Sequence, residues 1–262
     1  MQIIQRWTIL ITLIFVIFLG GCNSSNQASE NNNTDTASNA TPVAQISPSN
    51  PAFKNLPHLT GKATVEMVTD KGKVIIEVDG DHAPITAGNF VDLVKRGVYD
   101  KTVFHRVIRE PQPFVVQGGD PQSKDPNVPK QAFGTGSFVD PDTKKPRYIP
   151  LEILPEGEVN IVYSQTFPEA GIKKLPELQH KRGAVAMARS QPPDSASAQF
   201  YFALADLAFL DGNYAVFGYV TEGMEVVDKI QQGDRIKSAS LIENKKPAED
   251  KKETGKKETG KK

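Results

Sequence analysis

The chain has 262 residues, and its 31 basic and 31 acidic side chains give a net charge of zero. This balance argues against a nucleic-acid-binding protein, which needs a basic face. The single cysteine, Cys22, excludes an intramolecular disulfide and a thiolate metal cluster, and the four histidines lack the spacing of metal-ligating motifs. We therefore expect no metal site held by cysteine or histidine side chains.

The N-terminal segment has the features of an export signal. Arg6 precedes an apolar run over residues 7–19, which is shorter than the ~20 residues that a membrane-spanning helix needs. The sequence LGGC at residues 19–22 resembles the bacterial lipoprotein box, in which the cysteine is lipidated. We predict a lipoprotein signal peptide over residues 1–21 and a lipidated Cys22 that holds the protein on a membrane outside the cytoplasm, at its periplasmic or lumenal face. An uncleaved short anchor or a plain secretory signal is the alternative.

Two segments of low complexity flank the expected domain. Residues 22–59 are rich in Asn, Ser, Thr, Ala and Pro, so we predict a disordered tether behind the lipidated cysteine. Residues 245–262 repeat KKETG and carry eight lysines against four acidic residues. We predict a solvated, disordered tail there, with an anionic lipid or acidic partner as the alternative. One domain is expected over residues 60–244.

The domain is predicted to be mainly β-structure. Alternating apolar residues indicate a hairpin over residues 65–78, with its turn at Asp70-Lys71-Gly72. A helix is expected within residues 83–99, with Thr86 as its N-cap and Gly97 at its end. Five short β-like runs follow, and residues 223–233 predict a second helix that ends at Gly233. Many strands and two helices indicate a closed antiparallel barrel with helices over its ends.

Four motifs carry a resemblance to a known family. FHRVI…PFVVQGGD, GAVAMAR, SAQFYFAL and FLDGNYAVFG occur in the order and approximate spacing found in the cyclophilins, and the similarity runs from about residue 73 to residue 230. The cyclophilins are prolyl cis/trans isomerases with a closed eight-stranded antiparallel barrel capped by two α-helices. The resemblance implies this fold and this activity, without a metal or cofactor. It also implies a monomer whose partners are proline-containing peptides and unfolded proteins.

The resemblance assigns roles to individual residues. Arg106 corresponds to the catalytic arginine, Phe114 to the floor of the proline pocket, and Gln117 to the glutamine that positions Arg106 and the substrate carbonyl. Taken alone, Arg106 would also fit a solvated side chain at a strand edge. The resemblance also implies residues that bind the substrate. An apolar wall is formed by Val115, Met187, Tyr201, Phe209 and Leu210. Ala188 and Arg189 offer backbone groups, Gln199 bonds the peptide backbone, and Tyr214 lies at the rim.

Several features depart from the family pattern. The loop over residues 109–113 is longer than usual, and the long insertion over residues 121–182 contains a possible hairpin at residues 154–167. Phe209 stands where the best-known members have tryptophan, and Arg189 replaces an asparagine, which predicts a preference for acidic residues near the proline. The insertion keeps a second function open, a weakly active or inactive module that binds proline-containing segments or a membrane complex.

Overall fold

The computed structural model describes residues 53–242. Cys22, the predicted signal peptide, most of the predicted tether and the lysine-rich tail lie outside these residues. Within them, no helix is long and apolar enough to cross a membrane. The strands are β1 (Lys62–Thr69), β2 (Gly72–Asp79), β3 (Arg106–Ile108), β4 (Val115–Gly118), β5 (Glu152–Ile153), β6 (Val162–Tyr163), β7 (Ala184–Met187), β8 (Phe200–Ala203), β9 (Val216–Glu222) and β10 (Ile236–Ile242), and the α-helices are α1 (Pro84–Lys95) and α2 (Met224–Val227).

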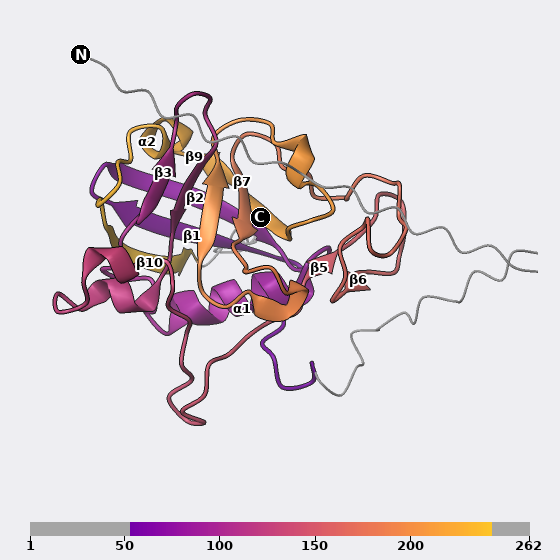
Figure 1. Cartoon of the computed structure of the whole chain (residues 1–262), viewed down its shortest axis with the longest axis horizontal. Helices are drawn as coiled ribbons and strands as arrows, with labels where there is room; N and C mark the ends of the chain where they lie inside the picture. Colours follow the sequence, from indigo (N-terminus) through magenta and orange to yellow (C-terminus); the bar gives the residue numbers. More distant parts are fainter. Residues whose placement is uncertain (1–52, 243–262) are drawn as a thin grey trace, which may run out of the picture. The chain divides into compact units, whose positions relative to one another are not determined.

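Eight of the strands form one curled antiparallel sheet, a half-barrel with α1 and α2 at opposite ends (Figure 1). The strand order is β10-β1-β2-β9-β7-β8-β4-β3. The prediction of a closed barrel was wrong, because β10 and β3 remain the two edges of the sheet. β3 has only three residues, and the chain before it meets the chain before β10 at a single bridge between Val103 and Arg235.

The predicted N-terminal hairpin is confirmed. β1 and β2 pair from Lys62 with Asp79 to Thr69 with Gly72, so the turn itself is Asp70-Lys71. Gly72 has a φ of 140°, and a Cβ atom there would lie 3.0 Å from the Val226 side chain. Only glycine meets both conditions without strain.

Helix α1 begins at Pro84, and the prediction of Thr86 as its N-cap was wrong. Thr86 is fully buried within the first turn, and no side chain next to the helix start caps it. The free N–H groups of Ile85 and Thr86 donate to the buried Glu152 carboxylate at 3.1 and 2.7 Å. The Tyr163 hydroxyl donates to the same carboxylate at 3.0 Å. The cap of α1 therefore comes from β5, far away in the sequence.

Helix α2 is shorter than predicted. It ends after Val227, and the chain up to Gly233 is not helical, although Ile230 remains fully buried. The Arg109 guanidinium, from the long loop after β3, donates to the carbonyls of Val227 and Ile230 at 3.2 and 2.7 Å. The Val227 carbonyl also accepts from the Ile230 N–H at 3.2 Å, so the Arg109 side chain and one tight backbone turn take the place of a further helical turn.

The long insertion carries the second sheet, the β5–β6 hairpin, which starts two residues before the predicted segment. The insertion packs against two loops that follow it in the sequence. The Ile149 N–H donates to the Ala196 carbonyl at 2.9 Å, and the Phe167 N–H donates to the Gly212 carbonyl at 2.8 Å. A Cβ atom at Gly212, whose φ is 74°, would lie 2.8 Å from the Phe167 side chain. The insertion therefore packs closely against both loops.

The main core lies between the curled sheet and α1. The ring of Phe90 on α1 lies 5.4 Å from Phe200 and 4.9 Å from Phe217, measured between centroids. The Tyr99 hydroxyl, buried in the same cluster, donates to the Ala198 carbonyl at 3.0 Å. Each fully buried ring contributes about 1.5–3 kcal/mol. This core fixes the position of β8, which carries Tyr201 of the candidate site.

Candidate functional site

Strand register brings the central residues of the site together. Arg106 on β3 pairs with Gln117 on β4, and Gln117 pairs with Tyr201 on β8. Directly paired residues point to the same face of a sheet, so the three side chains form one row. The Arg106 Nη1 donates to the Gln117 Oε1 at 3.3 Å. Gln117 thus contacts Arg106 as the resemblance implies.

Phe114 lies beside this row. The Arg106 Cζ atom is 5.5 Å from the centroid of the Phe114 ring, within the range of a cation–π contact. The Phe209 ring stacks on Phe114 with its centroid 5.9 Å away, although 69% of Phe209 is exposed. The guanidinium and Phe209 therefore both lie against Phe114.

A cavity of about 180 Å³ opens over these residues. Nine of the residues that the resemblance implied line it: Arg106, Phe114, Val115, Gln117, Ala188, Arg189, Tyr201, Leu210 and Tyr214.

Three other implied residues lie elsewhere. Met187 is in the main core and only 2% exposed. Its neighbour Ala186 pairs with Tyr201 and so faces the cavity side of the sheet. Because neighbouring residues of a strand face opposite sides, Met187 faces the core. The expectation that Met187 lines the apolar wall was therefore wrong. Phe209 does not line the cavity, although its ring stacks on Phe114, which does. Gln199 lines a neighbouring cavity. The Ala188 N–H already donates to the Gln199 carbonyl at 2.9 Å, so this group is not offered to a peptide.

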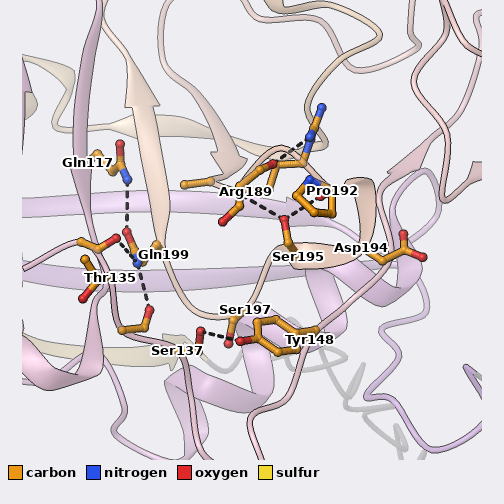
Figure 2. Close-up of a pocket in the computed structure, with 14 residues that line it drawn as sticks. Gln117, Thr135, Ser137, Tyr148, Arg189, Pro192, Asp194, Ser195, Ser197 and Gln199 are labelled. Carbon is orange, nitrogen blue, oxygen red and sulfur yellow. Dashed lines mark hydrogen bonds between the residues drawn. The ribbon is translucent and has the colours of Figure 1, made fainter.

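The neighbouring cavity has a volume of about 650 Å³ and shares Gln117, Ala188 and Arg189 with the first (Figure 2). Gln199 lies between Gln117 and the loop that precedes the insertion hairpin. Its Nε2 donates to the carbonyls of Gly134 and Gly136 at 3.0 and 2.9 Å, and its Oε1 accepts from the Gln117 Nε2 at 3.2 Å. Each amide has a single orientation that satisfies these contacts. The hydrogen bonds therefore form a chain in which donation runs from Arg106 through Gln117 and Gln199 to the loop carbonyls.

Other lining residues of this cavity were missed by sequence reasoning. Tyr148, from the insertion, lies across from Ser137, and Asp194 and Ser195 come from the loop after β7 (Figure 2). The Asp194 carboxylate accepts from the Leu151 N–H at 3.1 Å, which ties this loop to the insertion. No motif or spacing marks these residues, because their proximity arises from the packing of the insertion.

Comparison with known proteins agrees with this geometry. The family model described as cyclophilin type peptidyl-prolyl cis-trans isomerase matches residues 64–252. The chain belongs to the cyclophilin family.

Individual cyclophilins match over most of the domain. A protein of Synechocystis sp. named as a thylakoid lumen peptidyl-prolyl cis-trans isomerase is 45% identical over 72% of this chain and 49% of its own length. A chloroplastic peptidyl-prolyl cis-trans isomerase of Arabidopsis thaliana is 38% identical over 72% of this chain and 44% of its own length. The chain thus spans about half the length of these two relatives. A crystal structure of a Cryptosporidium parvum cyclophilin, determined in the presence of the dipeptide Ala-Pro, superposes with a TM-score of 0.51 at 25% identity and covers 69% of this chain and 99% of that chain.

In this cyclophilin, Arg189 joins the loops on either side of the shared cavity wall. Its Nε and Nη2 donate to the Asn213 carbonyl at 3.0 and 2.8 Å, and its Nη1 donates to the carbonyls of Ser190 and Gln191 at 2.9 and 2.8 Å. Its guanidinium also lies 4.8 Å from the centroid of Tyr214. Carbonyl groups satisfy these donors without neutralising the charge, so Arg189 brings a positive charge to both cavities.

We expect this charge to make the protein prefer peptides with an acidic residue near the proline. An exposed ion pair contributes up to about 1 kcal/mol, which corresponds to a preference of up to about fivefold for a glutamate over a lysine before the Ala-Pro unit. The measurement is kcat/KM for the two peptides. The Arg189→Gln variant should lose the preference, and a neutral peptide shows whether the variant has also disturbed the loops. Equal rates for both charged peptides with the unmodified protein would contradict the expectation.

Proposed function

We propose that this protein catalyses cis/trans isomerisation of X-Pro bonds in proline-containing peptides and unfolded proteins outside the cytoplasm. The observation that carries the proposal is the Arg106 guanidinium, which is oriented by Gln117 and lies over a cavity floored by Phe114. We assign Arg106, Phe114 and Gln117 as the catalytic residues. The other residues that line the cavity, together with Phe209 and Gln199 beside it, bind the peptide.

The chemistry of the reaction explains these residue types. Resonance gives the peptide C–N bond its double-bond character and a rotation barrier of about 18–20 kcal/mol. X-Pro bonds populate the cis state appreciably, but they exchange unaided in tens to hundreds of seconds. Twisting the bond breaks the resonance, and the proline nitrogen becomes pyramidal with a lone pair. A donor aimed at that nitrogen stabilises the twisted state more than either planar state, which is what catalysis requires.

Arg106 supplies such a donor. Its guanidinium is always protonated and holds its N–H groups in a rigid plane. Among the described residues it forms no ion pair that would neutralise it, and Gln117 occupies only one of its N–H groups. The remaining N–H groups are left to face a bound proline. No covalent bond to the protein forms in this reaction.

The cavity serves to hold the proline ring. Phe114, Val115, Leu210 and the Tyr201 ring give it apolar sides, and its volume of about 180 Å³ suits a single small ring. The Cryptosporidium parvum cyclophilin structure determined in the presence of Ala-Pro supports this class of ligand. With the ring held and Arg106 fixed above it, the carbonyl side of the bond is the part that turns.

The proposal is tested by the exchange of an Ala-Pro peptide, followed by NMR with the purified protein. Exchange far above the uncatalysed rate at micromolar protein supports the enzyme. Exchange at the uncatalysed rate, together with peptide-induced shifts of the cavity residues, would instead support a cyclophilin-like module that binds proline-containing segments. The tight packing of the insertion beside both cavities is the observation that favours this second function.

We further propose that the protein is a membrane-anchored lipoprotein. The domain organisation behind this is a signal peptide over residues 1–21, a lipidated Cys22 with a tether, the cyclophilin domain up to residue 244 and a lysine-rich tail over residues 245–262. The sequence of the lipoprotein box supports this, and the names of the two relatives, thylakoid lumen and chloroplastic, are consistent with a place outside the cytoplasm. The tether is shorter than the predicted residues 22–59, because Phe53 is buried in the main core and the Leu59 N–H donates to the Pro84 carbonyl at 3.0 Å.

Replacing Cys22 by serine should abolish the attachment of fatty acid to the protein. The lipoprotein box places the lipid on the cysteine thiol, and serine has no thiol to carry it. The measurement is labelling of cells that express the protein with a palmitate analogue, followed by isolation of the protein. A Ser24→Ala variant is the matched control and should be labelled like the unmodified protein. A Cys22→Ser protein that still carries the label would contradict lipidation at this residue.

A further inference from the structure

Tyr201, in the wall of the proline cavity, has a hydroxyl group that contacts a buried side chain outside the cavity. Tyr201 is 5% exposed and lines the cavity with its ring. Its hydroxyl oxygen lies 2.9 Å from the Nε2 of His180, whose side chain is completely buried. His180 does not line the cavity itself. It therefore acts on the site only through the residues that it holds.

The direction of this hydrogen bond follows from the third member of the group, Asp211. The His180 Nδ1 lies 2.8 Å from the Asp211 Oδ1, and an ionised carboxylate can only accept. The Nδ1 atom therefore carries the proton. Burial lowers the pKa of His180, more than the neighbouring Asp211 raises it, and this keeps the ring neutral. A neutral ring protonated on Nδ1 has a bare Nε2, so the Tyr201 hydroxyl must donate to it.

His180 also holds the loop that forms the opposite side of the cavity. Its own N–H donates to the Asp211 Oδ1 at 2.8 Å, and its carbonyl accepts from the Leu207 N–H at 2.7 Å. This loop carries the two cavity residues Leu210 and Tyr214. The ring of Tyr214 meets that of Tyr201 edge-on, with centroids 6.2 Å apart and an angle of 81°. One buried histidine thus connects both walls.

We propose that His180, oriented by Asp211, is a positioning residue that keeps the Tyr201 hydroxyl out of the proline cavity and holds the loop over residues 207–214 against it. The wall that meets the proline ring is then aromatic carbon. Without the Nε2 acceptor, the buried hydroxyl has no partner and turns toward the cavity or admits a water molecule there. The inference rests on the proposed function only in taking this cavity as the site of the proline.

The test is a double-mutant cycle read as peptide affinity. The proteins are the unmodified chain, His180→Leu, Tyr201→Phe and the double variant, each titrated with an Ala-Pro peptide by NMR. In His180→Leu the hydroxyl that faces the cavity loses its water when the peptide binds and gains no partner, so the variant should bind the peptide about tenfold more weakly. Removing the hydroxyl as well should restore most of this loss. For His180→Leu, the exchange rate at saturating peptide should change by no more than about twofold, since Arg106 and Gln117 are untouched.

The rescue distinguishes the proposal from a general packing role. If the loss of affinity in the double variant equals the product of the losses in the two single variants, then His180 does not act through the Tyr201 hydroxyl, and the proposal is overturned.

If His180→Leu fails to fold, His180→Gln takes its place, because it keeps a polar group near Nε2. It should bind within about threefold of the unmodified protein, and a tenfold loss would overturn the proposal. Peptide affinity can be read from the shifts whether or not the bond isomerises. A protein without isomerase activity would therefore defeat the proposed function and leave this test intact.

Discussion

Replacing Arg106 by alanine is expected to lower kcat/KM for an Ala-Pro peptide by about 10²–10³-fold. The side chain supplies a charged donor next to Phe114 on the floor of the proline cavity, and the bond that it makes strengthens only as the proline nitrogen gains its lone pair. The loss should therefore appear mainly in kcat, with KM little changed, because the peptide is held by Phe114 and its neighbours. NMR exchange over a range of peptide concentrations separates the two quantities.

Two controls make this result specific. Arg106→Lys keeps the charge but loses the planar set of donors, and it should recover only part of the rate. Lys229→Ala removes an exposed charge outside both cavities and should leave the rate unchanged. Arg106 is exposed, so its replacement should change the free energy of unfolding by no more than about 0.5 kcal/mol. A folded Arg106→Ala protein with full activity would remove the central support for the mechanism.

Replacing Glu152 by alanine should lower the free energy of unfolding by about 3 kcal/mol or more. The buried carboxylate accepts from the N–H groups of Ile85 and Thr86 and from the Tyr163 hydroxyl. All three donors would be left without a partner at the start of a helix whose first turn is buried. Each unsatisfied buried donor costs about 1–3 kcal/mol. The measurement is equilibrium unfolding in urea.

Tyr163→Phe is the matched control for this prediction. It removes one donor and leaves the two helical N–H groups capped, so it should cost only about 1 kcal/mol. Glu152→Gln should fall between the two variants, since its amide keeps one acceptor oxygen but brings an NH₂ group to a place that offers donors. If Glu152→Ala were as stable as Tyr163→Phe, the cap of α1 would have to be sought in another residue.

The strands of the fold could largely be predicted because their pattern is local. The hairpin of β1 and β2 follows from apolar alternation around a short turn, and the structure differs from the prediction only in where Gly72 belongs. The start of α1 could not be found in this way, because its cap, Glu152, is 66 residues from Thr86. The end of α2 depends in the same way on Arg109, and the open edge of the sheet depends on pairing that no local pattern encodes.

The site residues that lie within the family motifs could be predicted from the sequence, and the others could not. Arg106 and Gln117 are brought together by strand register, and the family motif contains both. Met187 lies in a motif too, but on the opposite face of its strand, which the motif alone does not show. His180 and Asp211 belong to separate segments, and a single histidine or aspartate has no spacing to mark it. Tyr148 reaches the second cavity through the insertion, whose path the sequence does not reveal.

The strand order also bears on when the domain can fold. β1, at the start of the domain, pairs with β10 at its end, through partners such as Thr64 and Ile242, and Ile236 on β10 is part of the main core. Such a contact joins distant parts of the chain, and contacts of this kind slow folding. A chain that is still being synthesised or exported and lacks β10 leaves β1 with a free edge, on which strands of other molecules can pair. The domain therefore completes its fold only after its last strand is available, and until then it depends on being kept apart from other copies.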